Sequence, residues 1–152
     1  MTRSVLFVCT GNTCRSPMAE RIFVKLAREA GLPWTASSAG THAAPGMPLT
    51  RAAIAALSER GLDGSEHRAR PVDAAMLAAA DAVFVMEAAQ RERLASRFPA
   101  FASKIALLGE SSDIEDPVGG DAASYAHCAA AIEAALQTIV LREKENYAPN
   151  PR

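Results

Sequence analysis

A cysteine and an arginine six positions apart, Cys9 and Arg15, enclose a short polar segment that could hold an oxyanion. The segment reads Cys9-Thr10-Gly11-Asn12-Thr13-Cys14-Arg15-Ser16, and it lies between an apolar run and a stretch with helical periodicity. A loop that passes from a strand into a helix N-terminus directs backbone N–H groups at one point, where the helix dipole adds positive potential. Such a loop favours phosphate as its ligand. The same field favours the thiolate form of Cys9, which is a nucleophile toward phosphorus.

The other side chains of the segment suit the same chemistry. Arg15 can fold over the loop and offer a planar fork of donors to two phosphate oxygens. Ser16 is placed to hydrogen-bond the Cys9 sulfur. Asn12 can adopt the left-handed conformation and tie the loop through its amide, while Gly11 allows a close approach of the backbone. We therefore expect residues 10–16 to form a phosphate cradle around Cys9.

The elements that would position this cradle alternate between strands and helices. We expect strands at 4–8, 35–39, 82–86 and 105–108, and helices at 17–30, 51–60, 74–79, 87–98 and 122–142, with Thr50 and Asp73 as N-caps. The run from Ser4 to Val8 has no polar face, which is typical of a strand buried on both sides of a parallel sheet. The alternation predicts right-handed βαβ units. The expected fold is α/β: a single-domain, doubly wound, four-stranded parallel sheet with helices on both faces, Rossmann-like, whose ligand lies beyond the strand carboxyl ends.

The size and composition of the chain limit what it can be. With 152 residues and 16.0 kDa, it is expected to form one domain over 1–142, followed by a loose tail over 143–152. The formal charge of -1 and the absence of charged blocks argue against nucleic-acid and membrane partners. The three cysteines are an odd number, which favours free thiols in a reducing compartment and a cytoplasmic location. No cysteines or histidines stand at metal-ligand spacing, so we expect no metal.

Four motifs together carry a family resemblance. The string VCTGNTCRSPMAE, with SAGT at 38–41, HRAR at 67–70 and Asp-Pro at 116–117, resembles the low-molecular-weight protein tyrosine phosphatase family over nearly the whole chain. The resemblance implies a doubly wound fold, no metal or other cofactor, and a phosphocysteine intermediate that releases inorganic phosphate. It also implies roles for the residues: Cys9 as nucleophile, Arg15 as phosphate clamp, Asn12 and Ser16 as loop organisers, and Asp116 as general acid.

Asp116 also makes chemical sense without the resemblance. A leaving group departing from phosphorus needs a proton donor on its far side, and the same carboxylate can then deprotonate the attacking water. Asp116 lies in a long polar loop after the fourth expected strand, and Pro117 stiffens it. We therefore expect one carboxylate to serve both steps.

Three further residues allow more than one interpretation. Cys14 could simply fill the loop, whereas the resemblance implies that it can form a reversible disulfide with Cys9 and so protect the nucleophile from overoxidation. The family pattern suggests that His67 supports the cradle, although an ordinary structural histidine is the simpler interpretation. Cys128 lies among alanines on the last helix and is expected to be a core residue.

Two departures from the family pattern bear on the substrate. Tyrosine-specific members usually carry two aromatic residues after Asp-Pro, whereas this chain has Val118-Gly119-Gly120. Thr13 stands where those members commonly have a bulkier aliphatic residue, so Thr13 is the expected specificity residue. Both features resemble the protein-arginine phosphatase branch of the family. The expected substrates are therefore proteins phosphorylated on arginine, and the alternative is a phosphatase for phosphotyrosine or small aryl phosphates.

Other functions fit the sequence less well. A phosphocysteine carrier should preserve its phosphocysteine, whereas Asp116 would discharge it to water. An arsenate reductase of this fold uses two later cysteines that are close together, and Cys128 has no such neighbour in the sequence. We expect the protein to be a monomer or a weak dimer.

Overall fold

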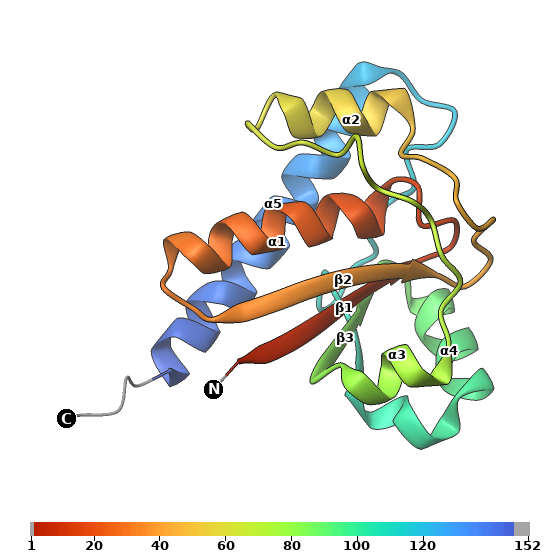
Figure 1. Cartoon of the computed structure of the whole chain (residues 1–152), viewed down its shortest axis with the longest axis vertical. Helices are drawn as coiled ribbons and strands as arrows, with labels where there is room; N and C mark the ends of the chain where they lie inside the picture. Colours follow the sequence, from red (N-terminus) through yellow and green to blue (C-terminus); the bar gives the residue numbers. More distant parts are fainter. Residues whose placement is uncertain (1, 148–152) are drawn as a thin grey trace.

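The computed structural model describes residues 2–147 and contains one four-stranded parallel sheet (Figure 1). Its strands are β1 (Arg3–Cys9), β2 (Trp34–Gly40), β3 (Ala82–Val85) and β4 (Ile105–Leu107), in the order β2-β1-β3-β4. All three pairings are parallel. The order of the strands reverses between β1 and β3, and the carboxyl edge at such a reversal is where open α/β sheets bind ligands. The predicted fold class is confirmed.

The central strand β1 is buried on both faces, as its apolar run predicted. Val5, Phe7 and Cys9 belong to one hydrophobic cluster, whereas Leu6 and Val8 belong to a second one on the opposite face. Side chains alternate between the two faces of a strand, so a strand between two helical layers needs apolar residues at every position. The result is a strand whose position is fixed from both sides just before the Cys9 cradle.

Helices cover both faces of the sheet. The helix α1 (Arg15–Glu29), the helix α2 (Arg51–Ser58) and the long helix α5 (Ala122–Asn146) lie together on one side, as Figure 1 shows. The helices α3 (Ala74–Ala79) and α4 (Ala88–Arg97), with the short 3₁₀ helix η1 (Pro99–Lys104), lie on the other. The two hydrophobic clusters fill the two layers between helices and sheet. This is the arrangement expected for a doubly wound sheet.

Side-chain caps fix where several helices begin. The Thr50 hydroxyl accepts a hydrogen bond from the Ala53 N–H at 3.3 Å, and Asp73 accepts one from Met76 at 2.8 Å. Both N-caps were predicted from the sequence. Such caps satisfy backbone donors that have no partner within the helix.

Several helix bounds differ from the sequence prediction, since α2 ends at Ser58 rather than at 60 and α4 spans Ala88–Arg97 rather than 87–98. Two further differences are of more consequence. Helix α1 begins at Arg15 rather than at Pro17, so Arg15 and Ser16 belong to its first turn. Helix α5 continues to Asn146 rather than ending at 142, so the first residues of the expected tail are helical. The segment Leu-Arg-Glu-Lys-Glu contains good helix formers and no glycine or proline, and Glu143 pairs with Arg3 at 3.5 Å. The rest of the expected tail, residues 148–152, lies outside the described residues.

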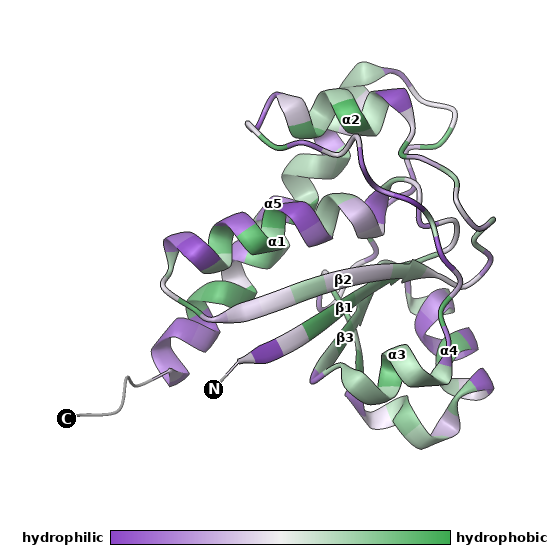
Figure 2. Ribbon diagram, viewed as in Figure 1, coloured by the Kyte–Doolittle hydropathy of each residue, from purple (hydrophilic) through white to green (hydrophobic). Residues whose placement is uncertain are grey.

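Hydropathy follows this layering. In Figure 2 the interior strand β3 and most of β1 are hydrophobic, whereas the edge strand β2, with the sequence Trp-Thr-Ala-Ser-Ser-Ala-Gly, is pale. None of the helices in residues 2–147 combines the length and apolar character that crossing a bilayer requires.

Candidate active site

The predicted cradle lies at the carboxyl end of β1, where the strand order reverses. Asn12 has a positive φ of 55°, the left-handed conformation that the sequence predicted for it. The tightly turned loop then enters α1 at Arg15. This geometry points the start of a fifteen-residue helix at the same spot as the loop, so both contribute positive potential there.

The Cys9 sulfur lies at the base of this loop and is held by hydrogen bonds. Ser16 Oγ is 2.9 Å away, and the Asn12 N–H donates to the sulfur at 3.3 Å. The Asn12 side-chain amide donates to Ser16 Oγ at 2.8 Å, which leaves the serine proton free to point toward Cys9. The arrangement is complementary to a sulfur that carries negative charge. The predicted contact between Ser16 and Cys9 is confirmed.

Asn12 is also anchored from outside the cradle. Its side-chain oxygen accepts a hydrogen bond from the Arg70 N–H at 3.0 Å. The buried His67 donates from Nε2 to the Asn12 carbonyl oxygen at 2.7 Å. A carbonyl oxygen can only accept, so this contact places a proton on Nε2. His67 and Arg70, both in the His-Arg-Ala-Arg segment at 67–70, thus hold the cradle in place through Asn12.

The cradle packs closely against the end of β2 at Gly40, whereas Gly11, within the cradle, has more space around it. A Cβ atom added at Gly11 would meet nothing nearer than the Thr13 hydroxyl at 3.5 Å, so no close approach within the protein requires this glycine. At Gly40, by contrast, an added Cβ would lie 2.6 Å from the Thr10 carbonyl oxygen. Backbone hydrogen bonds from Thr41 to Cys9 and from His42 to Thr10, both 2.9 Å, continue the contact. Close packing therefore requires a glycine at position 40, but it does not require one at position 11.

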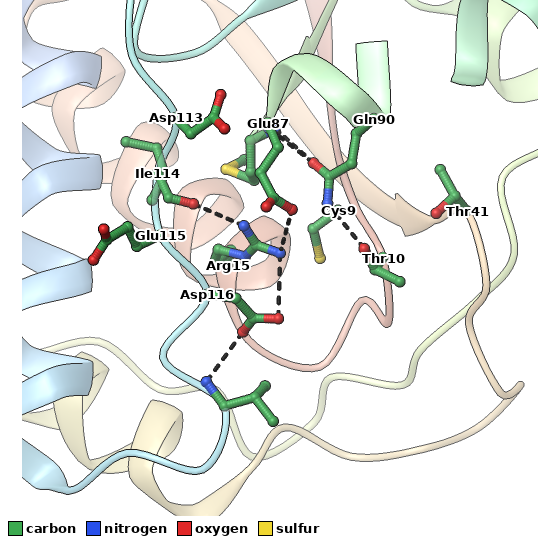
Figure 3. Close-up of polar contacts among 12 residues, drawn as sticks. Cys9, Thr10, Arg15, Thr41, Glu87, Gln90, Asp113, Ile114, Glu115 and Asp116 are labelled. Atoms are coloured by element: carbon green, nitrogen blue, oxygen red, sulfur yellow. Dashed lines mark hydrogen bonds and ion pairs between the residues drawn. The ribbon is translucent and has the colours of Figure 1, made fainter. Parts of the chain in front are cut away.

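The Arg15 guanidinium is buried and fixed from three directions (Figure 3). Nη1 donates to the Ile114 carbonyl oxygen at 2.7 Å, and Nη2 lies 3.2 Å from Glu87 and 3.5 Å from Asp116. A buried guanidinium group held in this way keeps its N–H donors in one orientation. The site therefore contains a preformed cationic group beside the Cys9 loop.

Two of these supporting residues were not expected from the sequence, Glu87 and Gln90, at the start of α4. The Gln90 side chain is buried; its oxygen accepts from the N–H groups of Met86 and Glu87, both at 3.0 Å. Its nitrogen donates to the Thr10 hydroxyl at 2.9 Å. The sequence could have indicated Glu87, because it follows the buried strand β3, whose carboxyl end lies at the same edge of the sheet as that of β1.

Asp116 lies in the loop before α5 and reaches the site beside Arg15 (Figure 3). Its other carboxylate oxygen accepts a hydrogen bond from the Val118 N–H at 3.1 Å, which orients the side chain. The residues after it form a tight turn, with Gly120 donating to the Pro117 carbonyl at 2.8 Å and Gly119 at a φ of 82°. Positive φ at this third position is characteristic of a type II turn.

The surface around Asp116 is acidic. An open cavity of about 760 Å³ is lined by Glu87, Ser111, Ser112, Asp113, Glu115 and Asp116. Thr13, the expected specificity residue, is half-buried in the cradle. Among residues 2–147, no group of three or more His, Cys, Asp or Glu side chains could hold a metal ion.

Cys14 and Cys128 form a pair that the sequence did not predict. Both thiols are buried and belong to the same hydrophobic cluster. The neighbouring Cys128 thiol and burial raise the pKa of Cys14, whereas the Cys14 thiol and the positive charge of Arg15 lower the pKa of Cys128. Cys128 is a buried residue, as expected, but it also borders the loop that carries Asp116, because its sulfur lies 3.7 Å from the Glu115 carbonyl oxygen.

Comparison with known proteins agrees with the cradle geometry. The family model described as low molecular weight phosphotyrosine protein phosphatase matches residues 4–147. The chain belongs to this family. It is therefore a cysteine-based phosphatase, and the recognition made from its motifs is confirmed.

Individual relatives of this phosphatase carry two different substrate names. The protein-arginine-phosphatase of Bacillus subtilis is 33% identical over 147 residues, which cover 93% of this chain and 97% of the relative. A probable low molecular weight protein-tyrosine-phosphatase, EpsP of Ralstonia nicotianae, is 36% identical over 141 residues, covering 91% and 90%. The solved structure of a mutant YwlE arginine phosphatase with a phosphorylated active-site serine has a TM-score of 0.91 at 32% identity, with coverage of 94% and 97%. Overall identity therefore does not separate the two substrates.

Proposed function

We propose that this phosphatase hydrolyses phosphoarginine on proteins through a phosphocysteine intermediate. The observation that carries the substrate assignment is the Asp116 loop. Its aspartate is followed by a compact Pro117–Gly120 turn with no aromatic side chain, and acidic residues surround it. The proposal assigns Cys9, Arg15 and Asp116 as the catalytic residues and residues 10–16 as the phosphate-binding loop.

Cys9 is the proposed nucleophile. Its thiolate attacks phosphorus, so that a P–S bond forms as the P–N bond to the guanidinium group breaks. Hydrogen bonds from Ser16 and the Asn12 N–H favour the thiolate before the attack and after its release. These donors are in place without rearrangement.

Arg15 is the proposed phosphate clamp. The contacts with Ile114 and Glu87 fix the guanidinium, so its remaining donors need no reorganisation when a phosphoryl group enters the loop. Loop N–H groups and the start of α1 supply further positive potential. Together they stabilise the negative charge on the equatorial oxygens in the transition state.

Asp116 is the proposed proton donor and acceptor. In its acid form it gives a proton to the departing guanidine nitrogen. As a carboxylate it then takes a proton from water, whose oxygen attacks phosphorus; the P–S bond breaks, Cys9 leaves as a thiolate, and inorganic phosphate is formed. The hydrogen bond from the Val118 N–H holds the carboxyl group in position for both steps.

The surroundings of Asp116 favour a cationic leaving group over an aryl one. An arginine side chain is planar and cationic, so it gains from nearby carboxylates such as Glu87, Asp113 and Glu115. A phenyl ring gains from apolar stacking, but the side chains after Pro117 are an exposed valine and two glycines. The Thr13 hydroxyl adds a polar group within the cradle.

The decisive experiment compares kcat/KM for one peptide sequence carrying either phosphoarginine or phosphotyrosine, with Cys9→Ser as the blank. A preference for phosphoarginine above about tenfold, near 1.4 kcal/mol, is expected. The variant Thr13→Ile should erode that preference, whereas Thr35→Ala, on the exposed part of β2, should leave it unchanged. A preference for phosphotyrosine would overturn the substrate assignment and leave the catalytic residues standing.

A further inference from the structure

We propose that a basic pocket beside the phosphate cradle binds an acidic side chain of the protein substrate, close in sequence to the phosphorylated residue. This basic pocket is lined by Thr41, His42, Arg93, Leu94 and Arg97. The inference rests on the proposed action on phosphorylated proteins, but not on the choice between phosphoarginine and phosphotyrosine. It adds a second specificity element to the enzyme, on the side of the cradle away from Asp116.

The two walls of the basic pocket are both attached to the cradle. On one side, the Thr41 N–H donates to the Cys9 carbonyl oxygen, and the next N–H along the chain donates to that of Thr10, both at 2.9 Å. On the other side, the Gln90 side chain of α4 donates to the Thr10 hydroxyl at 2.9 Å. An extended peptide advances about 3.3 Å per residue. A substrate whose phosphorylated residue occupies the cradle can therefore reach the basic pocket within a few residues.

The α4 wall of the basic pocket carries two positive charges. Arg93 and Arg97 follow Gln90 by three and seven positions, so they lie on the same face of the helix. Both are exposed, and within residues 2–147 neither takes part in an ion pair. The Arg97 guanidinium lies over the ring of Phe98, 5.0 Å from its centroid. Two guanidinium groups on one helix face can together bind a single carboxylate.

The size of the basic pocket suits one side chain. Its volume is about 280 Å³, and the buried Leu94 adds an apolar surface beside the two arginines. Pockets that hold cofactors or drug-sized ligands usually measure about 300–1,000 Å³. A glutamate or aspartate side chain offers a short apolar stem and a carboxylate, and so matches both parts of the lining.

The charges on the two sides of the cradle are opposite. Figure 3 shows Cys9 between Asp116, in its acidic surroundings, and Thr41, at the basic pocket. An acidic residue of the substrate is repelled on the first side and attracted on the second. The two surfaces together therefore favour one direction of the substrate chain across the cradle.

The test places one glutamate at a time in a peptide that is otherwise flanked by alanines, at each of the three positions before and after the phosphorylated residue. The peptides are made with phosphoarginine and again with phosphotyrosine, and the set that the wild-type enzyme hydrolyses faster is used. Glutamate at one or two positions on one side should raise kcat/KM about fivefold over the all-alanine peptide. Lysine at the same positions should not raise it.

The variants remove or reverse the charge of the basic pocket. In Arg93→Gln/Arg97→Gln, the ratio of kcat/KM for the glutamate peptide to that for the all-alanine peptide should fall to about one. In Arg93→Glu/Arg97→Glu, the preference should pass to the lysine peptide, which a purely structural role of the arginines does not explain. The control Arg91→Gln removes one positive charge from the same helix. Because Arg91 lines a different cavity, with Phe84 and Leu107, the ratio should keep its wild-type value.

The possible failures are distinguishable. Equal kcat/KM for the glutamate and all-alanine peptides in the wild type overturns this inference alone, and so does a glutamate preference that persists in Arg93→Gln/Arg97→Gln. Loss of the preference in Arg91→Gln as well would assign it to the overall charge of the enzyme, which also overturns the basic pocket. If neither set of peptides were hydrolysed while p-nitrophenyl phosphate was, both the proposed function and this inference would be wrong.

Discussion

The side chains around Cys9 are arranged so that each is positioned by a neighbour. Asn12 orients Ser16, Ser16 contacts the Cys9 sulfur, and His67 and the Arg70 N–H hold Asn12. The proposed proton donor is less constrained, because the Asp116 side chain is 45% exposed and its role depends on the substrate being in place. The proposed roles of Cys9 and Asp116 can therefore be tested by separate substitutions.

Replacing the acid should slow the reaction without removing the nucleophile. Asp116→Asn cannot protonate the leaving group, and kcat should fall by roughly 10² to 10⁴. An exposed aspartate outside the site provides the matched control, since Asp63→Asn should retain kcat within about threefold. Steady-state kinetics on a phosphoarginine peptide measures both variants. An unchanged rate in Asp116→Asn would mean that another group supplies the proton.

Loss of the Glu87 carboxylate should weaken the clamp. Glu87→Gln removes the charge that holds Arg15 Nη2, and the half-exposed position of Glu87 limits the effect to about tenfold in kcat/KM. Glu110→Gln is the matched control, because it breaks the surface ion pair with Arg142 far from the cradle. Equal kinetics in the two variants would show that Glu87 does not position Arg15.

At the scale of elements, the start of α5 depends on a single carboxylate. Asp121 accepts hydrogen bonds from the N–H and hydroxyl of Ser124, and these bonds lower the pKa of Asp121 below its ordinary value of 3.8. A lowered folded-state pKa means that Asp121 contributes stability above about pH 4 and that this contribution is lost as the pH falls through the folded value. Asp121→Ala should therefore lower the urea midpoint at pH 7 and reduce its loss on acidification.

The variant Asp121→Asn separates the contribution of the cap hydrogen bonds from the contribution of the titrating carboxylate. Asparagine retains the cap acceptor but does not titrate in this range, so its urea midpoint should stay above that of Asp121→Ala at pH 7. The same fall in midpoint between pH 7 and pH 3 for the wild type and Asp121→Ala would show that Asp121 plays no part in acid sensitivity.

The sequence predicted the elements better than it predicted the contacts between them. Apolar runs marked β1, β3 and β4, Thr50 and Asp73 marked helix starts, and the positive φ of Asn12 followed from its residue type and place. The contact of Gly40 with Thr10, the braces from Glu87 and Gln90, and the Cys14–Cys128 pair join segments far apart in the chain. Local patterns carry no information on such pairs, because the sheet order and helix packing decide which segments meet.

At the scale of the molecule, α5 closes the core. Its buried face belongs to the same cluster as residues from β1, α1 and α2, and Leu136 is fully buried there. Leu136→Ala should lower the free energy of unfolding by about 2–5 kcal/mol through lost burial and the cavity left behind. Leu141, on the same helix, is 60% exposed, so Leu141→Ala should change the free energy of unfolding by less than about 0.5 kcal/mol.

Urea denaturation followed by circular dichroism measures both changes. The contrast between the two leucines tests the packing of α5 directly, since the two substitutions are chemically identical and lie on one helix. Similar losses in the two variants would contradict the packing of α5 against α1 and α2.

The packing of α5 also has a consequence for the order in which the protein can fold during synthesis. A ribosome makes the chain from the N-terminus at about 5–20 residues per second, so β1, α1 and β2 emerge well before α5. Until the last helix follows, the faces of α1 and α2 that it covers remain open to water. The cradle residues are among the first to be made, yet the layer behind them is completed only by the last helix. A nascent chain stalled before α5 should therefore remain open to protease within α1, and protection should appear only when α5 is released.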